Sequence, residues 1–146
     1  MGARNIVRLI NDGLTQGLSS LRLYTTGSQD HGTEAVTATA DGLTTGLISQ
    51  GSKTVTVTSG NADHIVNLPA ATVGDIINIL VTGAACELRS AVTAHKANNL
   101  PIGATNELAL VQDSLYRCHY VSANNWIVTG VSKVGADEAA LQPNAV

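Results

Sequence analysis

The stretch covering residues 54–82 constrains the fold more than any other part of this chain, because three strand patterns follow one another within it. Residues 54–58 alternate threonine with valine, a period of two that is typical of a strand with one buried face. Residues 64–68 form a second short strand pattern, and Pro69 ends it because proline cannot donate to a hydrogen-bond ladder. Residues 76–81 are almost wholly apolar, which indicates a strand covered on both faces. The stretch therefore predicts a β-sheet.

Short strand patterns separated by turn residues continue through most of the chain, at the spacing typical of a sandwich or a barrel. Strands do not alternate with helices, so a parallel α/β sheet is not expected, and no internal repeat is evident. We expect an all-β fold, an antiparallel β-sandwich or barrel-like domain of about seven to nine short strands with an N-terminal arm or short helix. The further strand patterns lie at residues 34–40, 86–92, 107–112, 115–121 and 126–131, and residues 93–102 are predicted to form a surface loop.

The sequence divides into three parts. Residues 1–33 are predicted to form an N-terminal arm or helix and a linker, residues 34–132 the β domain, and residues 133–146 a C-terminal tail that is disordered or lies on a neighbour. Within residues 4–23 apolar side chains recur at helical spacing, but two glycines interrupt them, each costing about 1 kcal/mol relative to alanine in a helix. This segment is either a helix packed on its own domain or an arm that a partner orders.

The composition indicates that neighbouring molecules cover much of the surface. Charged residues make up 13% of the chain, about half the usual quarter, whereas an isolated monomer normally needs a more charged surface for solubility. The net charge of −3 argues against a general nucleic-acid binder. Arg4, Arg8 and Arg22 leave the N-terminal part locally positive, so they either suit an acidic partner surface or are solvated arginines on a short helix.

Neither a secretory signal nor a membrane-spanning apolar run is evident in the sequence. We therefore expect synthesis in a cytoplasm and no membrane partner.

No constellation of residues in the sequence indicates catalysis. The four histidines are scattered, and each is expected at a surface or edge position because a metal site needs several converging ligands. Ser59, Asp63 and His64 lie close together in the sequence, but a nucleophile elbow is missing and groups this near on a turn rarely reach triad geometry. We expect a protein that is not an enzyme and holds no metal or cofactor.

The cysteines and aromatic residues are predicted to be structural. Cys86 and Cys118 are the only cysteines, and both fall in strand patterns, so buried free thiols are favoured over a bridge between them. In the strand pattern that begins at Cys86, Glu87 and Arg89 are predicted to face outward. Trp126 could stack on a sugar or base, but in a chain without phenylalanine a core position is favoured.

Several segments of the chain resemble small structural proteins of tailed bacteriophages. The sequence is similar in particular to head decoration proteins and to related fibre-like virion modules, and the resemblance covers about residues 40–130. Its landmarks are a Thr/Val strand, a Leu-Pro stop, a glycine turn and a closing Asn-Trp-Ile. The segments that carry it are residues 56–69, 73–79, 86–89, 116–118 and 122–127.

The resemblance implies a structural virion protein that decorates, or cements, the outside of an assembled phage head. Such proteins commonly form homotrimers and bridge neighbouring capsomers, so the implied partners are the major capsid protein and further copies of this chain. A ligand that binds only the intact shell stabilises it by mass action. We hypothesise that the N-terminal arm docks on the capsid through Arg4, Ile6, Arg8, Leu9, Ile10 and Leu14.

The alternative function is a tail-fibre or spike module that binds a host surface glycan. In that case Trp126, Tyr120 or the loop at residues 93–106 would lie at an exposed tip.

Overall fold

The computed structural model describes residues 32–40, 45–51, 53–103, 106–137 and 142–145. The chain divides into one unit ending at Asp30 and a second beginning at His31, and the fold below is that of the second. The described residues form eleven β-strands and no helix, which confirms the all-β prediction for this part of the chain. The predicted N-terminal arm or helix lies outside the described residues.

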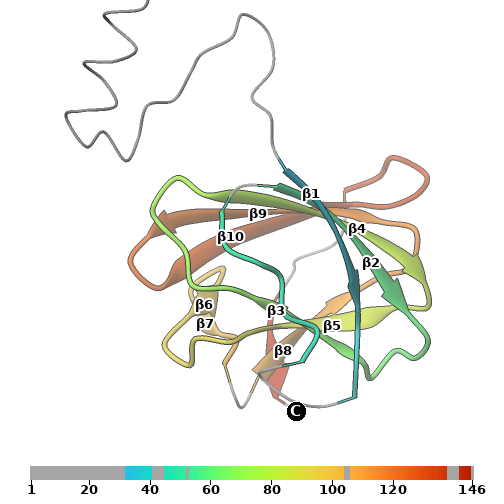
Figure 1. Cartoon of the computed structure of the whole chain (residues 1–146), viewed down its shortest axis with the longest axis horizontal. Helices are drawn as coiled ribbons and strands as arrows, with labels where there is room; N and C mark the ends of the chain where they lie inside the picture. Colours follow the sequence, from blue (N-terminus) through green and yellow to red (C-terminus); the bar gives the residue numbers. More distant parts are fainter. Residues whose placement is uncertain (1–31, 41–44, 52, 104–105, 138–141, 146) are drawn as a thin grey trace, which may run out of the picture. The chain divides into compact units, whose positions relative to one another are not determined.

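The strands form two sheets (Figure 1). The seven-stranded sheet has the order β1 (Gly32–Thr37), β2 (Lys53–Ser59), β4 (Ile76–Gly83), β9 (Leu115–Ser122), β10 (Asn125–Val131), β6 (Lys96–Ala97) and β7 (Leu100–Pro101). The four-stranded sheet has the order β11 (Asn144–Ala145), β8 (Asn106–Leu110), β5 (Cys86–Ser90) and β3 (Ile65–Leu68).

The chain winds as a parallel coil from β1 to β5. In the seven-stranded sheet β1, β2 and β4 run parallel, with Val57 between Val36 and Val81. In the four-stranded sheet β3 runs parallel to β5, with Val66 beside Leu88. Parallel neighbours need a crossover connection, commonly a helix. Here the crossover between β2 and β4 contains β3 of the other sheet.

The predicted antiparallel pairing is therefore wrong for the first half of the domain. In the second half it is correct for β9, which pairs antiparallel with both β4 and β10, and for β8 with β5, but wrong for β6, which runs parallel to β10. The turn signals in the sequence show where the chain reverses, but not whether the next strand joins the same sheet or the opposite one. That choice depends on the packing of the whole coil.

The residues predicted to form a surface loop at positions 93–102 instead contribute to the core. Ala97 and Ile102 are fully buried, and His95 is 3% exposed. Asn98 and Asn99 have φ values of 51° and 70°, which suits the two-residue turn that joins β6 to β7. The polar composition of this segment concealed two core residues and a tight hairpin.

The C-terminal tail prediction is wrong for the last residues described. β11 pairs antiparallel with β8, and Ala145 lies beside Asn106. Pro143 is buried. These residues therefore complete the four-stranded sheet of their own domain.

Both sheets contribute to one core of Val, Ile, Leu and a few aromatic side chains. Trp126 and Tyr116 are fully buried, as predicted for the aromatic residues. Cys86 and Cys118 are free and buried, also as predicted, and burial raises the pKa of each thiol to about 12. The Tyr116 hydroxyl group is hydrogen-bonded, because its Oη accepts the Val111 N–H at 2.6 Å.

We predict that Gly83→Ala destabilises the domain. Gly83 ends β4 with a φ of +80°, and a Cβ there would collide with the backbone carbonyl oxygen of Ser59. The Ala84 N–H donates to that same carbonyl, so the end of β4 cannot move away from Ser59 without losing this hydrogen bond. The free energy of unfolding should fall by about 2 kcal/mol or more in denaturant titrations.

Gly60→Ala is the matched control, because nothing lies within 4 Å of a Cβ at Gly60. Its free energy of unfolding should stay within about 0.5 kcal/mol of the wild type. Equal effects of the two substitutions would contradict the described approach of β4 to Ser59.

Candidate interaction surface

The outer face of the seven-stranded sheet carries an exposed row of apolar side chains. The inward residues of its long strands, such as Val57, Ile79 and Tyr116, are fully buried, so the residues between them face away from the core. The register places Leu80 opposite Leu115 on β9, and Leu115 opposite Val131 on β10. These three side chains are 39%, 47% and 41% exposed, respectively.

The same row continues with small side chains across the remaining strands of the parallel coil. Leu80 lies beside Thr56 on β2, and Thr56 lies beside Ala35 on β1. The neighbouring row contains Asn78, Arg117 and Thr129. The face is therefore a mixture of threonine and aliphatic side chains.

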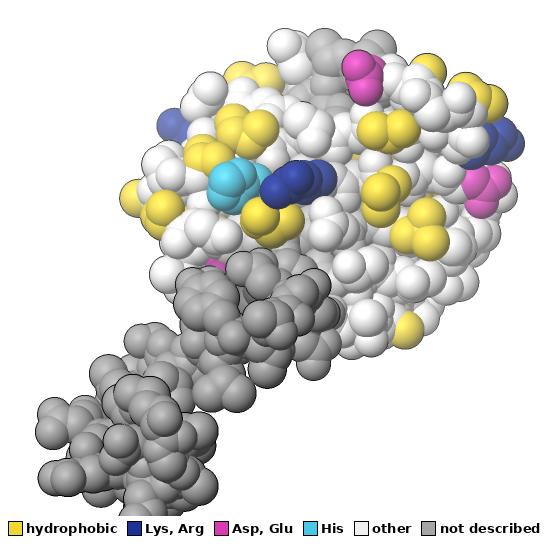
Figure 2. All heavy atoms as spheres, turned by 90° about the horizontal axis from the view of Figure 1, so that it is seen from above, with side chains coloured by type: hydrophobic (Ala, Val, Ile, Leu, Met, Phe, Trp, Pro, Cys, Tyr) yellow, Lys and Arg dark blue, Asp and Glu magenta, His cyan; other side chains and the backbone are white. Residues whose placement is uncertain are grey.

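Arg117 is the only Lys, Arg, Asp or Glu on this face within β2, β4, β9 and β10, whose residues the structure describes in full. Figure 2 shows the molecule from above, with hydrophobic side chains scattered around one central basic group and one histidine. A partner could cover such a face with little loss of charge hydration, because desolvating a charge costs far more than desolvating a hydroxyl.

The size of this face sets a limit on what it can bind alone. Strands lie about 4.8 Å apart and rise about 3.3 Å per residue, so five strands of about seven residues cover roughly 500 Å². A standard protein interface buries about 800 Å² on each partner. One copy of the face therefore supports a weak contact, and a stable one needs further surface.

Ser90 and His95 form a buried pair next to Trp126 of β10. The Ser90 Oγ lies 2.7 Å from the His95 Nδ1, which also accepts the Trp126 Nε1–H at 3.2 Å. Since the indole can only donate, the Nδ1 carries no proton. Burial lowers the pKa of His95, which favours the same neutral form. Because Ser90 is fully buried, a substrate could not reach this pair, and its role is to join β5, β6 and β10.

Ser59 and Asp63, which the sequence places close to His64, also have structural roles. The Ser59 Oγ donates to the Asn61 carbonyl oxygen at 2.7 Å and accepts the Asn61 N–H at 3.3 Å. The Asp63 N–H is bound by the Asn61 side chain at 3.2 Å. These bonds fix the turn between β2 and β3, and they use the Ser59 hydroxyl in that turn.

Arg89 was predicted to face outward, but it is 4% exposed. Its Nε and Nη2 donate to the Glu107 Oε2 at 2.9 and 2.6 Å. The two residues lie on the neighbouring strands β5 and β8, and removing one partner of a buried pair commonly costs about 3–5 kcal/mol. The alternating pattern correctly predicts that Arg89 points away from the shared core. It does not show that this residue is buried on the outer face of the four-stranded sheet.

Glu87 lies on the same strand as Arg89 and close to the same carboxylate. Burial raises the pKa of Glu87 to about 7, and its hydrogen bond with Glu107 and the charge of Glu107 act in the same direction. Arg89 opposes this shift, and Asp63 adds to it. At neutral pH the Glu87 carboxyl group is therefore partly protonated.

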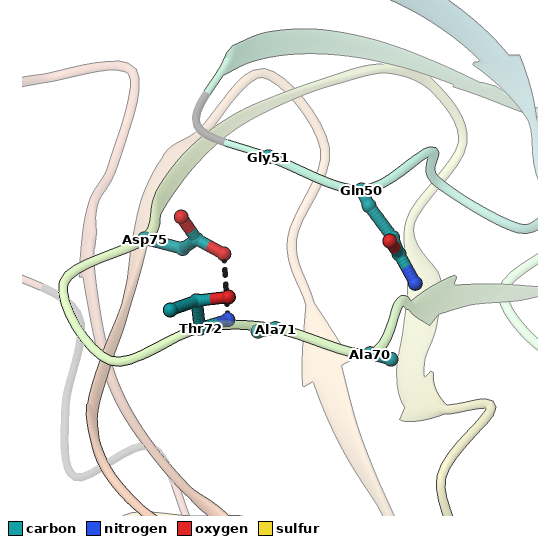
Figure 3. Close-up of a pocket in the computed structure, with 6 residues that line it drawn as sticks. All are labelled: Gln50, Gly51, Ala70, Ala71, Thr72 and Asp75. Atoms are coloured by element: carbon teal, nitrogen blue, oxygen red, sulfur yellow. Dashed lines mark hydrogen bonds between the residues drawn. The ribbon is translucent and has the colours of Figure 1, made fainter. Parts of the chain in front are cut away.

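A shallow hollow of about 390 Å³ lies between residues 50–51 and the loop that leads into β4 (Figure 3). Asp75 faces it, but the Asp75 Oδ2 accepts the Thr72 N–H at 2.8 Å and so belongs to the turn. The opposite wall carries Gln50. This arrangement brings one carboxylate and one amide to an open hollow, without a nucleophile and base pair.

The described ranges contain no cluster of three or more His, Cys, Asp or Glu side chains that could hold a metal ion. Within the same ranges, a helix long and apolar enough to cross a membrane is also absent.

The structure places only some of the residues singled out from the sequence. The proposed capsid-docking residues lie outside the described residues; they are Arg4, Ile6, Arg8, Leu9, Ile10 and Leu14. Trp126 is fully buried and Tyr120 is 6% exposed, so they do not form the exposed tip of the glycan-binding alternative. The prediction that residues 76–81 are covered on both faces is wrong, since Leu80 is 39% exposed. The apolar row on β4, β9 and β10 was missed, because it appears only when the register aligns three separate strands.

Comparisons of the chain with protein families, with characterised proteins and with solved structures found no match.

We predict that Glu87 makes the domain less stable as the pH rises. The pKa of Glu87 is raised in the folded state, so the folded chain binds more protons than the unfolded chain between pH 4.5 and about 7. The free energy of unfolding should therefore fall as the pH rises through this window. Glu87→Gln should remove that fall, which denaturant titrations at several pH values would measure.

Glu34→Gln provides a control of opposite sign. Burial alone would raise the pKa of Glu34, but hydrogen bonds from Ser49 and Lys53 lower it overall. The stability that Glu34 contributes is therefore present above pH 4.5 and lost as the pH falls. If Glu87→Gln left the pH dependence of unfolding unchanged, the described carboxyl cluster would be wrong.

Proposed function

We propose that this protein is a structural virion protein that binds the outside of an assembled phage head. The observation that carries the proposal is the exposed row of Leu80, Leu115 and Val131, on a face where β2, β4, β9 and β10 carry one charged residue, Arg117. The low share of charged residues in the whole chain supports it. The resemblance of residues 40–130 to head decoration proteins supplies the identity of the partner, the major capsid protein.

The energy available on this face suits a protein that acts in many copies. Fully burying one Leu or Val side chain contributes about 1.5–3 kcal/mol, and each of the three residues has somewhat less than half of its surface left to bury. The row therefore contributes roughly 3 kcal/mol in total, which is weak for one contact. On a shell, linked copies bind together, and the effective concentration of each further contact is high.

The proposal includes three finer expectations from the sequence. The two sheets form a β-sandwich around the shared core, the protein bridges capsomers as an oligomer of its own chain, and residues 1–33 supply a second docking contact. The mechanism is mass action, since a ligand that binds only the intact shell stabilises it. It requires neither catalysis nor a cofactor.

The aromatic residues that the glycan-binding alternative needs at the surface lie in the core. Trp126 packs against Tyr120 with ring centroids 4.9 Å apart and against His95 at 6.2 Å. An aromatic platform for a sugar needs a free ring face. No observation on the described residues favours this alternative over the first proposal.

We predict that Leu115→Asp abolishes tight binding to heads of the phage that encodes the chain. A carboxylate in the middle of the apolar row would have to be desolvated on docking, which should weaken binding by about 2 kcal/mol or more, or roughly 30-fold. Co-sedimentation of the purified variant with assembled heads would measure the change.

Leu47→Asp is the matched control. Leu47 is 44% exposed, close to the exposure of Leu115, but it pairs with Asn67 beside the four-stranded sheet. The control variant should bind heads as the wild type does, and both variants should unfold at similar temperatures. Equal loss in the two variants, or full binding by Leu115→Asp, would reject this face as the docking surface.

A further inference from the structure

Among the described residues, the seven-stranded sheet has one edge protected against strand addition and one edge without a neighbouring strand. At one end β7 is two residues long and contains Pro101, and a short strand with a proline is a common way to block strand addition. At the other end β1 is six residues long, from Gly32 to Thr37, without lysine or proline. No described residue pairs with the side of β1 that faces away from β2.

The one charged side chain on β1 does not guard this edge. The Glu34 carboxylate accepts the Ser49 N–H at 3.1 Å and the Ser49 Oγ–H at 2.8 Å, and it lies 3.2 Å from the Lys53 Nζ. Ser49 lies in the segment that leads into β2, and Lys53 is the first residue of β2. These bonds hold the charge on the β2 side of the strand.

The orientation of the backbone shows which groups of β1 are available. The Ala38 N–H donates to the Thr58 carbonyl oxygen on β2. Because backbone groups point alternately to the two sides of a strand, the even-numbered residues face β2. The N–H and C=O groups of Thr33, Ala35 and Thr37 therefore point to the open edge, and all three residues are exposed.

We propose that β1 pairs antiparallel with β1 of a second copy of this chain, about a twofold axis at Ala35. In this register Ala35 of each copy faces its equivalent, and Thr33 of one copy faces Thr37 of the other. All the residues whose backbone groups point outward then become hydrogen-bonded pairs. An antiparallel bonded pair exchanges both hydrogen bonds, so the contact supplies about six.

The side chains fit the same register. Thr33 opposite Thr37 is a favourable cross-strand pair. Glu34 lies opposite Val36 of the second copy, so the two carboxylates do not face each other. Like charges directly opposite would oppose such a pairing.

Pairing also removes the size limit of the outer face. The two seven-stranded sheets become one continuous sheet, and the row through Ala35, Thr56 and Leu80 continues from one copy into the next. The combined face of roughly 1,000 Å² exceeds the approximately 800 Å² per partner of a standard interface. This last argument rests on the proposed docking function, whereas the open edge of β1 does not.

The test is the mass of the full chain in solution, measured by sedimentation over a range of concentrations without phage heads. We expect about 30 kDa, twice the 15.0 kDa of one chain. Ala35→Pro should give a monomer, because it removes an outward N–H without removing a bond to β2. Ala35→Ser keeps the N–H and should remain a dimer.

A wild-type monomer or trimer would overturn the proposal, as would a dimer of Ala35→Pro. A chain that becomes a dimer only after residues 2–30 are deleted would also overturn it, since its own N-terminal segment would then occupy the edge. If Ala35→Pro fails to fold, amide hydrogen exchange of the wild type decides: the Ala35 N–H should exchange at least tenfold more slowly at high protein concentration. A dimer that does not bind heads would reject the proposed function alone.

Discussion

The register between β2 and β4 is the constraint on which the rest of the structure depends. It sets Val55 beside Ile79 and Val57 beside Val81 on the core side, and Thr56 beside Leu80 on the outer side. A shift by one residue would move every valine to the surface and every threonine into the core. Strands on both sides support this register. β1 pairs with the free side of β2, with Val36 beside Val57, and β9 pairs with the free side of β4.

The same register explains what the sequence could and could not predict. The Thr/Val alternation identified β2 and its buried face, and the two cysteines and Trp126 were correctly assigned to the core. Strand direction was not predictable, because the crossover between β2 and β4 contains a strand of the other sheet. The exposed apolar row was not predictable either, since Leu80, Leu115 and Val131 come from separate strands and meet only through the register. The arm residues proposed for docking remain a prediction.

Two groups of buried polar side chains connect strands of the described domain. The His95 Nδ1 accepts a hydrogen bond from the Trp126 Nε1–H. The ion pair of Arg89 and Glu107 joins β5 to β8. Both clusters are closed to a substrate by burial. In the described part of the chain, the low-charge sheet face and the outward backbone groups of β1 are exposed.

Hydroxyl-radical footprinting of the purified protein, alone and bound to assembled heads, tests the central claim that the outer face of the seven-stranded sheet is the docking surface. Side chains that a partner covers lose their reactivity, and exposed aliphatic side chains react measurably in the free protein. The account predicts protection of Leu80, Leu115 and Val131 on binding and no change at Leu47, which lies beside the other sheet. Protection of Leu47 with unchanged reactivity of the other three would contradict it.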